Sequence, residues 1–495
     1  MAKVNWYMWK LAIFVAIGTF LYGYDSGIVT ITIAKPSWIN YMGRPSPNYI
    51  GAVASVYSAG QALGCLFQVF VGDHISRIRF LQAMAMLEAA GVIVQAAATS
   101  MPMFIAGRAI AGFPTGALYL TTTIYLVEIS PSQTRGLVAG CGGLCIGFGI
   151  MVSSWIGYGA SHLPYGTLQW RLPIALQALW AVILVVGLAL HVPELPRFLM
   201  FNGRLDEARD VYFKLRPDLS AYRAEKDVSW LRAQVEFERT RQQDQSISEL
   251  FRLHRKRIGV AFTAGVISSL TGAQVIGYYQ IQLYQQLGIE LKHRLLLAGV
   301  YGTVCFLAVM TTDNFVIDVW GRRNLILFGL IGCVLAQIYS AIMHWQFEFT
   351  TNQVGKGFAV GGIYLLTAVH YAAFGSTAGI YQAEVLPVAI RSKMMGLTGF
   401  ASFCIMTGLS EAAPVAFVTI RQNFYSVFVG ATTVCLVIAA LWFPETKHKR
   451  LEEIAAVFDD TVLTVPESWQ KELVRGEARR KRILSCCSGG DVVVQ

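Results

Sequence analysis

Apolar residues along the chain gather into blocks of roughly 20 residues that are separated by shorter polar stretches. A helix of that length spans about 30 Å, which matches the hydrocarbon core of a bilayer. The pattern therefore predicts an all-α membrane protein with 12 transmembrane helices. The predicted spans cover 10–32, 50–71, 80–99, 103–126, 136–158, 171–192, 258–284, 295–316, 323–343, 357–383, 393–418 and 423–443.

Two long polar segments divide the chain. They predict a six-helix bundle at 1–192, a linker at 193–257, a second six-helix bundle at 258–443 and a tail at 444–495. Within the linker, the stretch 205–215 alternates apolar and charged positions at helical spacing, so it predicts a short amphipathic helix.

The charge distribution agrees with a membrane protein. Only 14% of the residues are charged, against about 25% in a typical soluble domain. The net charge is +10, but 23 of the 40 Lys and Arg residues lie in the linker and the tail. Basic segments beside membrane spans favour the cytoplasmic side, so we expect both termini to be cytoplasmic and no nucleic-acid partner.

Three motifs recur at an offset of roughly 250 residues, in matched places of the two six-helix sets. A Glu with an Arg seven positions later follows the fourth and tenth spans, an Asp and an Arg follow the second and eighth, and Pro-Glu follows the sixth and twelfth. Such repetition indicates two equivalent halves, the architecture of secondary transporters with the substrate between the halves.

The charged residues of these motifs are candidates for a cytoplasmic gate. Acid–base pairs there would tie the two bundles together and break when the site faces inward. The alternative is that they only fix the topology. The gate candidates are Asp73, Arg77, Glu128, Arg135, Glu194, Arg197, Asp318, Arg322, Arg323, Glu384, Arg391 and Glu445.

Together the motifs resemble those of the sugar-porter family of the major facilitator superfamily. The matching segments are Gly23-Tyr24-Asp25-Ser26-Gly27, Gly107-Arg108, Tyr125 to Glu128 with Thr123 in place of Pro, Asp318 to Arg323, Glu384 to Arg391, and Pro444-Glu445-Thr446-Lys447. The resemblance implies the major facilitator fold, alternating access between two six-helix bundles, and a single chain that suffices for transport.

Two ionisable residues lie deep in predicted spans, where charges are costly and often functional: Asp25 and Arg108. In proton-coupled members of the similar family, the residues at these positions form the proton site. The resemblance thus implies that Asp25 and Arg108 couple protons to transport; the alternative is a fixed structural ion pair.

The segments that bind sugar in the similar family are altered here. Where hexose carriers have Gln, Gln and Asn in helix 7, this chain has Ser268, Ser269 and Gln274, followed by Tyr278 and Tyr279. Gly143 replaces a Gln of helix 5, and the helix 10 segment around Gly379 lacks the usual Pro and Trp, which predicts a less bent helix.

These positions predict a larger cavity and a substrate other than plain glucose, such as a polyol, a cyclic acid, a glycoside or a specialised metabolite. Glu411 in helix 11 is a further cavity candidate: it either binds a cationic or hydroxylated substrate or faces water near the outer end.

The leading hypothesis is a proton symporter of a sugar-like or other small polar solute in the plasma membrane. An exporter of a specialised metabolite and a non-transporting nutrient sensor are the alternatives. We find no GxxxxGKS, GxSxG or HExxH motif, and the nine Cys show no CxxC spacing with nearby His, so we expect no enzyme, cofactor or metal site. The expected partners are the small-molecule substrate, protons and the lipid bilayer.

Overall fold

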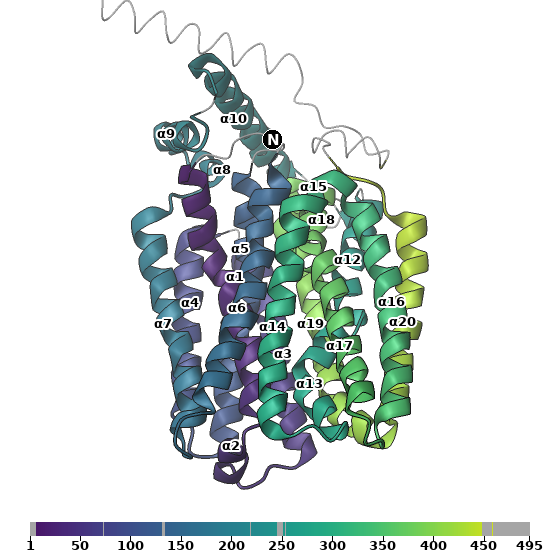
Figure 1. Cartoon of the computed structure of the whole chain (residues 1–495). Coiled ribbons are helices and arrows are strands. Elements are labelled where there is room, and N and C mark those ends of the chain that lie inside the picture. Colours follow the sequence, from purple (N-terminus) through teal and green to yellow (C-terminus); the bar gives the residue numbers. More distant parts are fainter. Residues whose placement is uncertain are drawn as a thin grey trace, which may run out of the picture.

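The computed structural model describes residues 6–72, 74–130, 134–217, 219–244, 251–252, 254–447 and 458. In this part of the chain 12 helical spans are long and apolar enough to cross a membrane, which confirms the predicted number. They stand side by side in one bundle (Figure 1).

The first six spans are single helices: α1 (Trp6–Thr32), α3 (Pro47–Val71), α4 (Arg77–Ala96), α5 (Met101–Ile129), α6 (Arg135–Ala160) and α7 (Leu168–His191). The other six are α12 (Arg255–Leu270) with α13 (Ala273–Gln286), α14 (Leu291–Thr311), α16 (Arg322–Phe347), α17 (Gln353–Phe374) with α18 (Thr377–Val385), α19 (Val388–Thr419) and α20 (Phe424–Trp442). A π-helical segment (Thr312–Val316) and the short α15 (Ile317–Trp320) follow α14, and a 3₁₀ turn (Arg421–Asn423) precedes α20.

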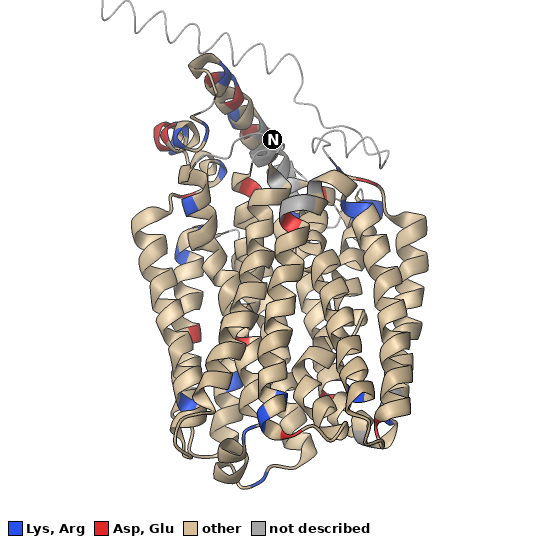
Figure 2. Cartoon of the chain, viewed as in Figure 1, with Lys and Arg blue, Asp and Glu red and all other residues tan. Residues whose placement is uncertain are grey.

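Short helices mark the two ends of the bundle. At one end, here called the linker end, lie α8 (Pro196–Phe201), α9 (Leu205–Leu215) and α10 (Ala221–Asp244); at the other, the far end, lies α2 (Pro36–Tyr41) (Figure 1). The predicted linker helix is confirmed as α9, which buries Ala208 against Leu199, Met200 and Val235. Charged residues gather at the two ends and on these linker helices, while few lie within the bundle (Figure 2).

The two six-helix halves meet along two helix pairs. α3 packs along α19, and α6 packs along α14. The other spans mainly contact helices of their own half, such as α1 with α6 and α16 with α17. The helices at the centre between the halves are therefore α1, α5, α12–α13 and α17–α18. These helices position the candidate site described below.

Two of the central spans are interrupted. Between α12 and α13 the chain turns at Thr271 and Gly272, and Gly272 has a φ of +68°, which favours glycine because it has no Cβ. Between α17 and α18 the interruption falls at Gly375 and Ser376. Ser376 stands where the similar family has Pro, so the missing Pro does not make α17 and α18 one continuous helix; a smaller bend than in the family stays a prediction. Broken helices free backbone and polar groups at mid-membrane, where transporters bind their substrates.

The repeat read from the motifs is visible as matching contacts. In the first half, the Tyr125 hydroxyl donates to the Pro193 carbonyl at 2.7 Å; in the second, the Tyr381 hydroxyl donates to the Pro444 carbonyl at 2.9 Å. Each tyrosine lies in the fourth span of its half, and each proline follows the sixth span. The two halves therefore share a structural element as well as a sequence motif.

Candidate functional site

A buried ion pair joins α1 and α5 in the first half. Arg108 donates through Nη1 to Asp25 Oδ2, and both side chains are at most 1% exposed. Arg108 also donates through Nε to the Val53 carbonyl at 3.2 Å, and its guanidinium carbon lies 3.8 Å from the centre of the Tyr57 ring. The structure thus brings together the two residues predicted to couple protons.

The pair is not saturated with hydrogen bonds. Asp25 Oδ1 and Arg108 Nη2 are buried and have no hydrogen-bond partner among the described residues. A buried ion pair contributes little to stability unless its remaining groups are satisfied, and such exceptions often mark functional sites. Glu88, a second buried acid in this half, accepts a hydrogen bond from Gln177 Nε2 at 3.0 Å through Oε1, and its Oε2 is likewise buried without a partner among the described residues.

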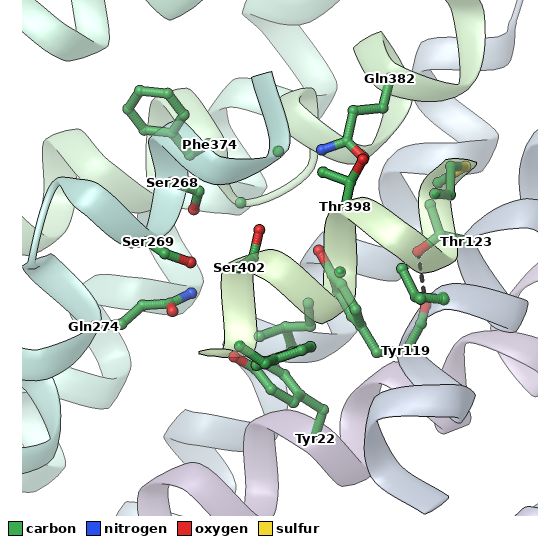
Figure 3. Close-up of a pocket in the computed structure, with 18 of the residues that line it drawn as sticks. Tyr22, Tyr119, Thr123, Ser268, Ser269, Gln274, Phe374, Gln382, Thr398 and Ser402 are labelled. Atoms are coloured by element: carbon green, nitrogen blue, oxygen red, sulfur yellow. Dashed lines mark hydrogen bonds between the residues drawn. The ribbon is translucent and has the colours of Figure 1, made fainter. Parts of the chain in front are cut away.

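A cavity lies between the two halves beside the breaks between α12 and α13 and between α17 and α18 (Figure 3). Four residues proposed from the sequence for the substrate cavity are among its lining: Ser268, Ser269, Gln274 and Gly379. Side chains that the sequence did not indicate complete the walls, among them Tyr22, Tyr119, Leu120, Thr123, Ile146, His370, Tyr371, Phe374, Gln382, Thr398, Ser402 and Phe403.

A second, smaller cavity continues toward the far end. The predicted cavity residue Tyr278 lines it together with Ser26 and Gln280. Tyr22, Gln274 and Tyr371 line both cavities. Gln274, from the first turn of α13, therefore stands where the two cavities adjoin.

The prediction for Gly143 is wrong in this conformation, because no free space replaces the missing side chain. A Cβ at Gly143 would overlap Ser376 Oγ and lie 2.7 Å from the Gly375 carbonyl oxygen. The backbone at the break between α17 and α18 fills the space that a longer side chain would need, and Gly143 is not among the residues that line either cavity.

Two other predicted cavity residues also lie outside the described linings. Tyr279 is buried and donates to the Ser410 carbonyl at 2.8 Å within the second half. Glu411 is exposed near the far end, where its Oε2 accepts from Ser55 Oγ at 2.6 Å. Glu411 therefore joins α19 to α3. Its exposed position near the far end favours the alternative of a water-facing residue over that of a cavity ligand.

Further contacts hold the two halves together toward the far end. Ser26 and Tyr278 share a hydrogen bond of 3.3 Å between their hydroxyls, and Trp155 Nε1 donates to Thr303 Oγ1 at 3.0 Å. With Ser55 and Glu411, they bridge α1 to α13, α6 to α14 and α3 to α19.

At the linker end the second half carries a charged cluster. Arg322 Nη2 lies 3.3 Å from Glu384 Oε1, and both residues are buried. Thr446 Oγ1 donates to the other Glu384 oxygen at 2.8 Å. The Glu445 carboxylate accepts from the backbone N–H groups of Arg322 and Arg323 at 3.0 and 3.2 Å, so it caps the N-terminus of α16.

The first half carries the equivalent cluster, of which the structure describes the following contacts. Ser76, which precedes α4, donates through Oγ to Glu194 Oε1. Burial raises the pKa of Glu194 above its ordinary value, while the Ser76 hydrogen bond and Arg79 act in the opposite direction. Arg77 donates to the Gly72 carbonyl and lies 3.5 Å from Ser392 Oγ of the second half.

The pair formed by Arg322 and Glu384 lies within the second half, so it does not itself tie the two halves together, and a tie between the halves through gate pairs stays a prediction. Near the linker end, the contacts between the halves include a hydrogen bond from Gln68 Nε2 to Ser392 Oγ at 3.0 Å. Glu128 lies in the last turn of α5, Arg197 lies in α8, and Arg391 Nη2 donates to the Leu386 carbonyl at 3.3 Å. Asp73 and the side chains of Arg135 and Asp318 lie outside the described part of the chain.

The sequence reasoning missed one buried acid at the interface of the halves. Asp313, in the π-helical segment after α14, is 6% exposed and accepts from Ser376 Oγ at 2.7 Å. Ser376 Oγ also lies 3.2 Å from the Gly140 carbonyl oxygen of the first half. The signal was present in the sequence, since Asp313 is a charged residue within a predicted apolar span.

Comparisons with known proteins agree with this architecture. A family model described as sugar (and other) transporter matches residues 11–458. The MFS-type transporter criB of Aspergillus cristatus is 31% identical over 457 residues, which cover 90% of this chain and 92% of that protein. The low-affinity glucose transporter HXT3 of Saccharomyces cerevisiae is 26% identical, with 94% of this chain and 84% of HXT3 covered.

Solved structures show the same fold. The proton:xylose symporter XylE bound to 6-bromo-6-deoxy-D-glucose matches with a TM-score of 0.78 at 19% identity, and the match covers 92% of this chain and 99% of XylE. An inward-open form of XylE from E. coli matches with a TM-score of 0.67, also at 19% identity. The bundle of twelve spans in two halves is therefore the fold of this transporter class.

Proposed function

Because this chain belongs to the sugar (and other) transporter family, as its motifs predicted, and is a multi-pass secondary transporter, we propose that it moves a small organic solute together with protons. The observation that carries this proposal is the cavity between the halves with the buried Asp25–Arg108 pair beside it. Asp25 is adjacent in α1 to Ser26 and lies one helical turn from Tyr22, and both of these residues line cavities.

Protonation of Asp25 would couple the two movements. The ionised carboxylate attracts the Arg108 guanidinium and holds α1 against α5. A proton on Asp25 removes that attraction, so α1, with Tyr22 and Ser26, becomes freer to move against the second half. Binding of solute and proton then favours the change of state through their different affinities for its two conformations.

We assign the linker end to the cytoplasm, since most of the basic residues lie in the linker and the tail. In this assignment the larger cavity, which reaches Thr123 and Gln382, lies on the cytoplasmic side of Gln274, and the contact between Ser55 and Glu411 lies near the outside. One chain encloses the whole pathway, so we infer that the monomer transports, in the plasma membrane.

Transport by relatives supports a sugar-sized solute. Similar proteins include glucose transporters and myo-inositol transporter 3 of Cryptococcus neoformans, which is 25% identical. The Ser268 and Ser269 positions support a solute other than plain glucose, because their short side chains reach less far than the Gln pair of hexose carriers.

Uptake tests the proposal. Transporter-deficient yeast cells that express the protein should accumulate a solute from a labelled panel of hexoses, polyols and glycosides faster at pH 5 than at pH 7, and a protonophore should abolish the accumulation. Asp25→Asn should lose accumulation against a gradient and keep exchange, because Asn cannot carry the proton.

The matched control is Asp210→Asn, which changes an exposed acid of α9 in the same way. Accumulation that remains pH-dependent in Asp25→Asn would contradict the proton site. A protein that reaches the cell surface but exchanges none of the panel would contradict the proposed transport.

A further inference from the structure

Both halves contribute aromatic side chains to the larger cavity, and the second half adds most of the short polar ones. The first half supplies the rings of Tyr22 and Tyr119 together with the aliphatic side chains of Leu120 and Ile146. Thr123 is also present, but its hydroxyl already donates to the Tyr119 carbonyl at 2.9 Å. The wall formed by the first half is therefore mainly aromatic and aliphatic.

The second half supplies most of the short polar side chains. Ser268, Ser269 and Gln274 extend from the break between α12 and α13 toward the cavity, and Ser402 of α19 faces them across it (Figure 3). Ser402 Oγ is buried without a hydrogen-bond partner among the described residues. Gln382 adds another amide, which lies beside Thr398 (Figure 3). A ligand in the cavity thus meets short polar side chains of the second half, and the first half offers it the hydroxyls of Tyr22 and Tyr119.

Three rings gather on the other side and define an aromatic wall. Tyr22 lies 5.3 Å from Tyr119 between ring centres, and Phe403 lies 6.3 Å from Tyr22 and 6.4 Å from Tyr119. The rings are tilted or edge-on to one another, so no two of them are stacked face to face. Phe403 belongs to the second half, so a ligand on this wall contacts both halves at once.

The linings of both cavities are uncharged. None of their described residues is Asp, Glu, Lys or Arg. The larger cavity is also lined by one histidine, His370, which is buried and shares a hydrogen bond of 3.1 Å between its Nδ1 and Thr271 Oγ1. An ionic solute would leave water without a partner of opposite charge, which is strongly unfavourable.

We propose that the transported solute is uncharged and carries an aromatic ring that lies against Tyr22, Tyr119 and Phe403. Its hydroxyl or carbonyl groups face Ser268, Ser269 and Gln274. A hexose has hydroxyls around its whole edge and each needs a partner when buried, whereas an arene offers an apolar ring to the three clustered rings and needs fewer polar partners. This inference rests on the proposed function only in that the cavity is the transport site. It excludes the cyclic acids that the sequence left open as substrates.

Binding to the purified full-length protein tests the ring. Phenyl β-D-glucoside and methyl β-D-glucoside share their polar part, and we expect the phenyl compound to bind about tenfold more tightly because its ring gains two or three aromatic contacts. In Tyr119→Leu and in Phe403→Leu the preference should fall to about twofold or less. Tyr222→Leu, which alters an exposed tyrosine of α10, is the matched control and should keep the full preference.

A second pair of probes tests the charge. 4-Hydroxybenzamide and 4-hydroxybenzoate have nearly the same shape at pH 7, and we expect binding of the neutral amide only. Equal binding of the two glucosides, a preference that survives in both folded ring variants, or tighter binding of the benzoate would each overturn the inference. Thermal melting of each variant separates a lost ring contact from a lost fold.

Counterflow in proteoliposomes separates this inference from the proposed function. Exchange of glucose and polyols without any preference for the phenyl compound would retain transport and refute the aromatic solute. Preferential binding of phenyl β-D-glucoside without exchange would retain the ring site and refute transport.

Discussion

Gly143→Ala should destabilise the conformation in which the two halves meet near the linker end. The added Cβ would overlap Ser376 Oγ and lie 2.7 and 2.8 Å from the carbonyl oxygen and carbon of Gly375. The Ser376 hydroxyl can rotate away, but the Gly375 backbone cannot. α6 and the break between α17 and α18 must therefore move apart.

The magnitude follows from the kind of contact. Inserting one methyl group into a packed site costs about 1–3 kcal/mol. Here the cost falls on a state in which the first half touches the second, and it disappears once they separate. The equilibrium between closed and open linker ends should shift toward the open form by about 5- to 150-fold.

Thiol labelling measures this shift. Thr123 lines the cavity, and a Cβ at Gly379 of the second half would lie 3.2 Å from its Cγ2, so Thr123→Cys in a cysteine-free background reports on separation near the linker end. With Gly143→Ala added, an impermeant maleimide should label this cysteine at least about fivefold faster from the linker side. Gly159→Ala in the same helix is the control, since a Cβ there would have no neighbour within 4 Å. Labelling and transport at wild-type rates in Gly143→Ala would refute the contact.

Two further predictions concern stability and pH. Glu445→Ala should lower the unfolding free energy by about 1–2 kcal/mol, because two N–H groups at the start of α16 lose their acceptor. Glu445→Gln keeps one carbonyl oxygen and should lose less. Melting in detergent, with Asp210→Ala as the control, measures both variants, and melting temperatures equal to that of the wild type would contradict the cap. Burial lowers the pKa of Lys35, outside the spans, from its ordinary 10.5 to about 8, so the folded state takes up this proton later than the unfolded state as pH falls. The free energy of unfolding of the wild type should therefore rise relative to that of Lys35→Met by on the order of 3 kcal/mol as pH rises from 8 to 10.5, with no relative change below pH 7. A difference between the two proteins that stays constant from pH 8 to 10.5 would contradict the burial of a charged Lys35.

The sequence predicted the spans well because their length and apolar content are set by the bilayer itself. α9 was also predictable, since its alternating pattern needs only local information. The motifs identified Asp25 and Arg108 as a pair and placed Ser268, Ser269 and Gln274 at a cavity, because similar chains keep the same helix order.

The failures have a common cause, which is that a sequence does not show what a neighbouring helix does. Gly143 was expected to enlarge the cavity, but the Gly375 backbone and the Ser376 side chain occupy the space beside it. The sequence also did not show that Arg322 and Glu384 pair with each other within one half. The aromatic wall was invisible because Tyr22, Tyr119 and Phe403 lie on three helices and share no local pattern.

The matched tyrosine contacts bear on how the protein is built during synthesis. In each half the residues just after the sixth span turn back, so that Pro193 or Pro444 meets a tyrosine of the fourth span and the next residue, Glu194 or Glu445, meets the start of the third. Each half is thus fastened by its own last residues. The first half can close as soon as the ribosome has delivered Glu194, before any span of the second half has entered the membrane.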